Sequence, residues 1–308
     1  MKISLDALLV IDAISRNGSF AGAAEELHRV PSAITYTVQK LEQDLGIKLF
    51  DRSGHRARLT AAGEELLREG RFLLRAANDL ECRVQRVATG WESELRLAVD
   101  DIIPVERLFP LLKAFYRERP ATRIRLLSEI LGGCWDALLS GRADLTIATG
   151  EPPREGSIAI EPLGDFEFVF AVSPDHPLAD APEPLSANDL LQQRAVPAAD
   201  TSRSLPARSS GLLDGQDTLT VPTIRAKLSA QIAGLGVGYL PLRWAEPHIK
   251  AGRLVAKTVE GPKPAASVHL AWHPRQAGKA AGWFIERLRE PRMRAYLLGE
   301  AGYPEAES

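Results

Sequence analysis

Residues 18–58, GSFAGAAEELHRVPSAITYTVQKLEQDLGIKLFDRSGHRAR, are the stretch around which the rest of the chain is organised. Apolar residues recur at helical spacing from Phe20 to Leu27, and again from Ile34 to Leu45. Ser19 and Ser32 are suited to cap these two helices, because a serine hydroxyl can accept a hydrogen bond from a free backbone N–H. The stretch therefore predicts two short helices joined by a tight turn and followed by a small hairpin.

The second of these helices divides into an apolar seam and a polar face. Because Ile34, Val38 and Leu41 occupy the seam, the opposite side carries mostly uncharged hydrogen-bonding residues. These residues are Ser32, Thr35, Tyr36, Gln39, Lys40 and Gln43. A short helix with such a face can lie in the major groove of DNA and contact base edges. The ordinary alternative is a helix face that only contacts water.

The charge of this segment gives limited support to DNA binding. The whole chain has a net charge of −2, so it lacks the basicity that favours nucleic acids. Residues 18–58 contain six Lys or Arg and five Asp or Glu, a net of +1. Arg52, Arg56 and Arg58 nevertheless cluster on the expected hairpin, which predicts phosphate contacts. Arg52 could equally pair with a nearby carboxylate such as Asp51 or Glu42.

Length and composition indicate an ordinary globular protein. The chain has 308 residues, which suggests two or three domains, with 45% hydrophobic and 25% charged residues. No apolar run is long enough to span a bilayer, and the N-terminus lacks the features of a signal peptide. Two cysteines, Cys82 and Cys134, give no disulfide framework, so we expect a cytoplasmic protein with two unrelated thiols rather than a redox pair.

Residues 61–90 predict one long helix with a heptad repeat. One core position holds Leu66, Leu73, Leu80 and Val87, and the other holds Gly63, Gly70, Ala77 and Val84. A long helix with a single narrow apolar seam needs a partner to cover it. We expect this partner to be a second copy of the chain, with the two glycines allowing a close approach. The alternative is packing against the globular part of the same chain.

From Glu94 onward, strand and helix patterns alternate at the spacing of a parallel, doubly wound sheet. The expected strands lie near 95–99, 124–126, 145–148, 166–172, 219–221, 237–240 and 268–272, and the expected helices include 104–116 and one from 132. Pro- and Gly-rich breaks at 150–156 and 261–264 suggest two lobes with crossings between them. The last residues are polar and aperiodic, so we expect a frayed tail.

These motifs resemble the LysR-type transcriptional regulator family over nearly the whole chain, to about residue 290. The N-terminal motif is highly specific for the family. The C-terminal motifs are individually weak but occur in the order found in the family. The resemblance is carried by Gly18–Phe20, Ala23–Ala24, Leu27, Ser32–Ile34, Leu41–Glu42, Leu45–Gly46, Leu49–Phe50, Arg52, Leu59–Thr60, Ala62–Gly63, Gly141–Leu145, His176–Leu178, Gly234–Val237 and Leu240–Pro241. Many members carry arginine where Tyr36 stands and glutamine where Pro31 stands, so base preference should differ.

The resemblance implies an α/β protein with an N-terminal all-α winged helix-turn-helix, a long linker helix, and a two-lobed α/β effector domain like type 2 periplasmic solute-binding proteins. The implied domains are 1–60, 61–90 and 91–295, with lobe I at about 91–164 and 266–295, lobe II at about 165–265, and the tail at 296–308. The implied partners are promoter DNA with inverted repeats, a small-molecule effector and RNA polymerase. The implied state is a cytoplasmic homodimer or dimer of dimers.

The effector should bind where carboxyl ends of strands and helix N-termini face the cleft between the lobes. The resemblance places ligand-facing loops at the same segments. The predicted residues are Asp100, Asp101, Ile102, Glu129, Ile130, Thr149, Asp200, Thr201, Ser202, Arg203, Pro222 and Thr223. Three carboxylates make one wall acidic, which argues against an anionic ligand unless Arg203 faces it. For each residue, a capping or turn role is an equally good interpretation.

Two other functions compete with a regulator. The two-lobed part alone could be a solute-binding transport component, but such a protein needs an export signal or a lipid anchor. A small-molecule enzyme is the other alternative, although no G-x-S-x-G, P-loop or H-E-x-x-H motif is present. His269 and His273 are four apart on an expected strand, which does not favour a shared metal. We therefore expect no catalytic residue, no metal and no cofactor.

Overall fold

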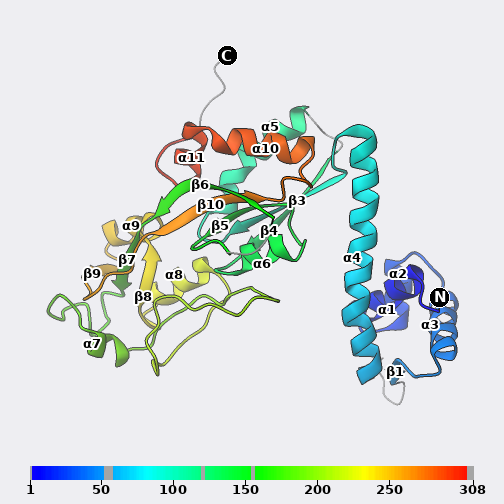
Figure 1. Cartoon of the computed structure of the whole chain (residues 1–308). Coiled ribbons are helices and arrows are strands. Elements are labelled where there is room, and N and C mark those ends of the chain that lie inside the picture. Colours follow the sequence, from blue (N-terminus) through cyan, green and yellow to red (C-terminus); the bar gives the residue numbers. More distant parts are fainter. Residues whose placement is uncertain (1, 52–57, 119–121, 154–156, 304–308) are drawn as a thin grey trace. The chain divides into compact units, whose positions relative to one another are not determined.

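The computed structural model describes residues 2–51, 58–118, 122–153 and 157–303 (Figure 1). The chain divides between Gln85 and Arg86 into two compact units. Within the described ranges, no helix is long and apolar enough to cross a membrane.

The N-terminal unit contains the expected helices and hairpin. Its elements are α1 (Leu5–Asn17), α2 (Phe20–Glu26), α3 (Pro31–Leu45), β1 (Phe50–Asp51), β2 (Arg58–Leu59) and the start of α4 (Ala61–Thr89). Ser19 accepts a hydrogen bond from the backbone N–H of Gly22 and caps α2, as predicted. Ile11, Ile34 and Leu49 are fully buried in the core, so the apolar seam of α3 faces inward.

The start of α3 differs from the prediction. Ser32 does not cap the helix, because α3 begins at Pro31 and Val30 occupies the capping position without a side-chain hydrogen bond. Proline suits the first helical position, since its φ is already helical and its missing N–H has no partner there. The hydroxyl of Ser32 therefore stays on the exposed surface of the first turn.

Glu42 fastens α3 to the first strand of the hairpin. Its carboxylate is buried and accepts hydrogen bonds from the backbone N–H groups of Leu49 and Phe50, at 2.8 and 3.3 Å. The amino group of Lys48 lies 3.0 Å from its other oxygen. Burial alone would raise the pKa of Glu42, but these hydrogen bonds outweigh it and hold that pKa below the ordinary value. The carboxylate thus fixes where the wing begins relative to α3.

The first turns of α4 pack on the N-terminal unit of the same chain. A methyl group at Gly63 would overlap the carbonyl oxygen of Leu49, and one at Gly70 would lie 2.7 Å from a methyl carbon of Leu8. Both glycines are buried by their own chain, so the prediction that they admit a second copy is wrong. Leucine at either position has no room, because the neighbouring backbone and side chain already fill it.

The remaining turns of α4 leave apolar residues uncovered. The exposed fractions of Leu73, Leu80 and Val84 are 54%, 55% and 61%. Water thus contacts most of the heptad seam beyond Gly70 in a single chain, as expected for a seam that needs a partner.

The first lobe of the C-terminal unit is a five-stranded sheet in the order β4-β3-β5-β10-β6. Its elements are β3 (Glu94–Asp100), η1 (Val105–Leu108), α5 (Phe109–Glu118), β4 (Arg123–Glu129), α6 (Gly133–Leu139), β5 (Leu145–Thr149), β6 (Ala159–Phe166), β10 (Ala266–Trp272), α10 (Lys279–Arg289) and α11 (Pro291–Leu297). Helices α5, α10 and α11 cover one face, where Phe115 packs against Phe284, and α6 covers the other (Figure 1).

The sheet is mixed rather than wholly parallel. Strand β3 pairs in parallel with β4 and β5, as predicted. Strand β10 pairs antiparallel with both β5 and β6. The reason is topological: β10 follows the second lobe, so the chain re-enters the sheet from the opposite end without the crossover helix that a parallel neighbour requires.

The second lobe is a smaller antiparallel sheet in the order β8-β7-β9. Its elements are β7 (Phe168–Val172), α7 (Ala187–Leu191), α8 (Ile224–Ile232), β8 (Gly238–Pro241), α9 (Leu242–Lys250) and β9 (Val255–Lys257). The expected strand at 219–221 makes only isolated bridges, through Thr218 and Val221. The expected frayed tail also differs, because Leu297 and Leu298 are buried and the ring of Tyr303 packs against that of Tyr296.

We predict that Glu42→Gln lowers the free energy of unfolding of the protein by roughly 1–3 kcal/mol, because a neutral amide replaces a buried charged acceptor of hydrogen bonds. The pKa of Glu42 is lowered by folding, so its contribution is complete above the ordinary glutamate range and lost as the pH falls through the lowered value. Urea unfolding at pH 7 tests this. Asp44→Asn, an exposed change on the same helix, is the control, and equal loss in both variants would contradict the role of Glu42.

Candidate DNA-reading face and ligand cleft

The polar face of α3 points into solvent. Ser32, Gln39 and Lys40 are exposed, and 64% of the surface of Tyr36, the aromatic residue of this helix, is exposed. Tyr36, Gln39 and Lys40 make no hydrogen bond or ion pair within the part of the chain that the structure describes. Their donors and acceptors are therefore available to another molecule.

Thr35 is placed differently from its neighbours. It is half-buried, and its hydroxyl donates a hydrogen bond of 3.0 Å to the carbonyl oxygen of Pro31. In this rotamer the hydroxyl can only accept from a base, while its methyl group remains able to contact a thymine methyl.

The described part of the hairpin carries one of the three predicted phosphate contacts. Arg58, on β2, is exposed. Arg52 and Arg56 lie outside the described residues. Glu42, one possible partner of Arg52, is occupied by Lys48 and two backbone N–H groups.

A cavity of about 150 Å³ lies between the two lobes of the C-terminal unit, at the carboxyl ends of β3 and β5. Four of the predicted residues line it, namely Asp100, Ile102, Ile130 and Thr149. The second lobe supplies Phe168 from β7 and Tyr239 from β8 to the opposite wall. The cavity therefore lies where strand ends of an open α/β sheet commonly bind ligands.

The other predicted residues do not line this cavity, and most serve the local structure. Asp101 accepts a 2.6 Å hydrogen bond from the backbone N–H of Ile224, at the start of α8. Thr223 caps the same helix through the N–H of Ala226. Pro222 is exposed and outside the cavity.

A second group of predicted residues ties lobe I to the 200–208 segment. Glu129 is buried, pairs with Arg142 and accepts a hydrogen bond from the hydroxyl of Thr201. Asp200 accepts from the backbone N–H groups of Ser202, Arg208 and Gly132. Arg203 is exposed and does not face the cleft. These contacts are the turn and capping roles that competed with ligand binding in the sequence.

The cleft contains three cations that the sequence analysis did not identify: Arg208, Lys227 and Lys263. Lys227 is buried on α8 and forms no hydrogen bond or ion pair with any described residue. Burial, and the neighbouring Lys263, lower its pKa to about 7. Burial likewise lowers the pKa of Lys263 to about 8, while Asp100 opposes that shift.

Asp100 is the only carboxylate among the described residues that line the cleft. It accepts hydrogen bonds from the Thr149 hydroxyl and, at 3.1 Å, from the N–H of Ile102. Burial raises its pKa to about 6, against these hydrogen bonds. The prediction of an acidic wall is therefore wrong. Asp101 and Glu129 form hydrogen bonds outside the cavity, and cations outnumber carboxylates among the described residues that line it.

The sequence contained a weak signal for Lys227. Ile224, Leu228 and Ile232 mark the apolar stripe of α8, and Lys227 and Gln231 lie one position before two of these residues. Both polar residues consequently turn inward, and both polar atoms of the buried Gln231 amide lack a hydrogen-bond partner among described residues. A lysine and a glutamine four apart beside an apolar stripe indicate a polar interior site.

Cys134 has no feature of a reactive thiol. It is fully buried on α6, and burial raises its pKa well above the ordinary value. A thiol that stays protonated is a poor nucleophile, so Cys134 acts as a core residue.

We predict that Lys227→Met raises the melting temperature, because it removes a buried amino group without a partner. The folded pKa of about 7 lies below the ordinary 10.5, so burial penalises folding fully below pH 7 and less as the pH rises toward 10.5. The gain should thus be larger at pH 6 than at pH 9 in thermal melts. The exposed Lys113→Met is the control, and a lower melting temperature at pH 6 would contradict the prediction.

Comparison with known proteins identifies both units. Residues 88–291 match the LysR substrate binding domain, and residues 5–64 match the bacterial regulatory helix-turn-helix protein, lysR family. The chain is 43% identical to "Uncharacterized HTH-type transcriptional regulator YeeY" of Escherichia coli (strain K12), over 94% of each protein. It is 40% identical to "Probable HTH-type transcriptional regulator YhaJ" of the same strain, over 93% of this chain and 96% of that protein.

The fold is also that of solved regulators. Full-length CbnR complexed with its target DNA matches 97% of this chain and 100% of that chain, with a TM-score of 0.59 at 21% identity. Two matched domains and relatives of this identity along nearly the whole length place the chain in one family. The chain belongs to the LysR family, and it is a DNA-binding transcriptional regulator with a C-terminal effector domain.

Proposed function

We propose that two copies of this regulator read the two halves of an inverted repeat through α3, and that a small anionic molecule in the interlobe cleft controls the outcome at the promoter. The observation that carries the second part is the buried amino group of Lys227, which has no partner among the described residues. We assign the protein a cytoplasmic location, no enzymatic role, and RNA polymerase as a further partner at the promoter.

The contact residues that we assign to DNA are those of the exposed polar face, Ser32, Thr35, Tyr36, Gln39 and Lys40, with Arg52, Arg56 and Arg58 on phosphates. The free donors and acceptors of Tyr36, Gln39 and Lys40 support this assignment. The DNA complex of CbnR, a protein with the same fold, supports a role for DNA itself as the partner.

The uncovered seam of α4 supports a dimer. Leu73, Leu80 and Val84 expose more than half of their surface in one chain, and covering them with a second copy would remove this apolar area from water. A dimer of the N-terminal unit also doubles the number of base and phosphate contacts. This matters because each unit is barely basic and binds weakly alone.

The charges around the cleft support an anionic effector. A carboxylate or another anion between Lys227, Lys263 and Arg208 would offset the penalty of burying positive charge. Asp100 opposes an anion when it is ionised, and with a pKa of about 6 it is mostly ionised near neutral pH, so the three cations have to outweigh its charge. The Thr149 hydroxyl already donates to Asp100, so this pair can orient a ligand only by accepting a hydrogen bond from a donor group on it.

We predict that Tyr36→Ala weakens binding to the specific site by about 1–3 kcal/mol, because a side chain that reaches base edges is removed. Binding to unrelated DNA should change little. Fluorescence anisotropy with a specific and a scrambled duplex, at one salt concentration, measures both affinities. Asp44→Asn on the same helix is the control. Equal weakening on the two duplexes would assign Tyr36 to the backbone rather than to the bases.

Arg58→Ala should weaken binding to both duplexes by the same factor, because a phosphate contact carries no sequence information. The slope of log K against log salt concentration should also become shallower by about one unit, since one cation fewer displaces counterions from the DNA. The salt titration decides the matter. An unchanged salt slope would remove Arg58 from the phosphate contacts.

A further inference from the structure

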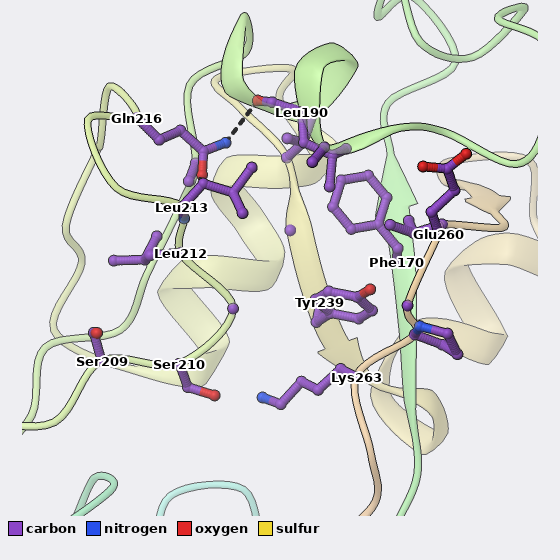
Figure 2. A pocket seen from close by; sticks show the side chains of 18 of the residues that line it. Phe170, Leu190, Ser209, Ser210, Leu212, Leu213, Gln216, Tyr239, Glu260 and Lys263 are labelled. Atoms are coloured by element: carbon purple, nitrogen blue, oxygen red, sulfur yellow. Dashed lines mark hydrogen bonds between the residues drawn. The ribbon is translucent and has the colours of Figure 1, made fainter.

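A second and larger cavity, of about 440 Å³, lies within lobe II (Figure 2). Its walls come from β7, β8, the 209–216 loop and the 259–264 segment. Its volume falls in the range of small-molecule sites, roughly 300–1,000 Å³. The interlobe cavity, at about 150 Å³, lies below that range.

The lining of this lobe II cavity is mainly apolar. The rings of Phe170 and Tyr239 meet edge to face at 5.3 Å and form one wall, and Leu190 and Leu213 also line the space (Figure 2). Gln216 is a polar lining residue whose amide is already used. Its NH₂ group donates to the carbonyl oxygens of Leu190 and Gln193, at 2.8 and 3.0 Å, and its oxygen accepts from the N–H of Leu213. The carboxylate of Glu260 also lines the cavity, but this residue is exposed, so the apolar interior suits a hydrocarbon group.

The two cavities meet at residues that line both of them. Ser210, Tyr239 and Lys263 each contribute to the interlobe cleft and to the lobe II cavity. Gly238 lines the lobe II cavity, and a methyl group placed on it would lie 3.6 Å from the amino nitrogen of Lys227. The same methyl group would lie 3.2 Å from the amide nitrogen of Gln231, so the buried amine and this amide both lie next to the Gly238 backbone that lines the lobe II cavity.

We propose that the lobe II cavity binds the apolar tail of the effector, while its anionic head lies in the cleft beside Lys227 and Lys263. The effector is then a carboxylate with an alkyl or aryl body of several carbons. This inference rests on the anionic effector proposed above. The arrangement places the head group at the junction of the cavities, where the amino group of Lys263 also lies 3.8 Å from the Phe168 ring centre.

The sizes of the two spaces favour one ligand that extends through both. An anion confined to the interlobe cavity would leave the larger apolar space without a ligand. Each methylene that enters that space should improve affinity about fourfold, from the free energy of burying a CH₂ group. The cations of the cleft then select the anionic head of the ligand, and the apolar surface in lobe II selects its hydrocarbon tail.

The experiment is calorimetric titration of the full-length protein with acetate, butyrate, hexanoate and octanoate. In the wild type, affinity should rise by about sixteenfold for every two added methylenes between butyrate and octanoate. Leu213→Trp, which fills the lobe II cavity, should remove this gain and leave butyrate binding unchanged. Leu212→Trp, at a residue that lines the lobe II cavity and not the cleft, is a second variant that should do the same if Leu213→Trp does not fold.

Ala207→Trp places a tryptophan on the adjoining 200–208 segment, at an exposed residue that lines neither cavity, and should bind the series as the wild type does. Lys227→Met should weaken every member of the series by the same factor. The proposal is overturned if butyrate and octanoate bind with equal affinity, or if no member of the series binds. It is also overturned if affinity still rises with chain length in both tryptophan variants. If affinity rises with chain length but Lys227→Met binds the series as tightly as the wild type, the placement of the anionic head beside Lys227 is wrong. Lobe II would then hold an apolar site alone.

Discussion

The long helix α4 imposes the constraint on which the function of the molecule depends. Its first turns are locked to the N-terminal unit, where Gly63 and Gly70 admit the backbone of Leu49 and the side chain of Leu8. Its later turns expose Leu73, Leu80 and Val84 to water. In the proposed dimer, the later turns would pack against a second copy while the first turns hold the DNA-reading unit of their own chain. Because each face is barely basic, the proposed dimer would add the DNA contacts that one copy lacks.

In the C-terminal unit, a buried group that costs stability lies at the proposed ligand site. A protein gains nothing in stability by burying the amino group of Lys227 without a partner, and buried polar groups that lack partners usually mark functional sites. The surrounding polar residues are, by contrast, well paired. Glu129, Thr201 and Asp200 hold the 200–208 segment against lobe I and so form the frame of the cleft. Among the cleft cations, this pairing holds Arg208, whose backbone N–H donates to Asp200.

Periodicity and capping predicted the N-terminal unit well, because its helices are short, local and bounded by Ser19 and Gly46. The same reasoning failed at Ser32, where the fixed φ of Pro31 started the helix earlier. Strand direction in lobe I could not be predicted from local pattern, since β10 joins the sheet only after the chain returns from lobe II. The cleft cations were missed for a similar reason. Strand ends locate a cleft, but Lys227 and Lys263 reach it from a helix and a loop of the other lobe.

The binding of two copies to two half-sites is tested most directly by footprinting. The full-length protein is footprinted on the DNA upstream of its own gene and on genomic fragments that it binds. The account predicts a protected inverted repeat whose half-sites lie on one face of the duplex, about one helical turn or a multiple apart. Both halves should become protected at the same protein concentration, because the dimer binds as a unit. Protection of a single unrepeated site, or of no site on any fragment, would contradict the account.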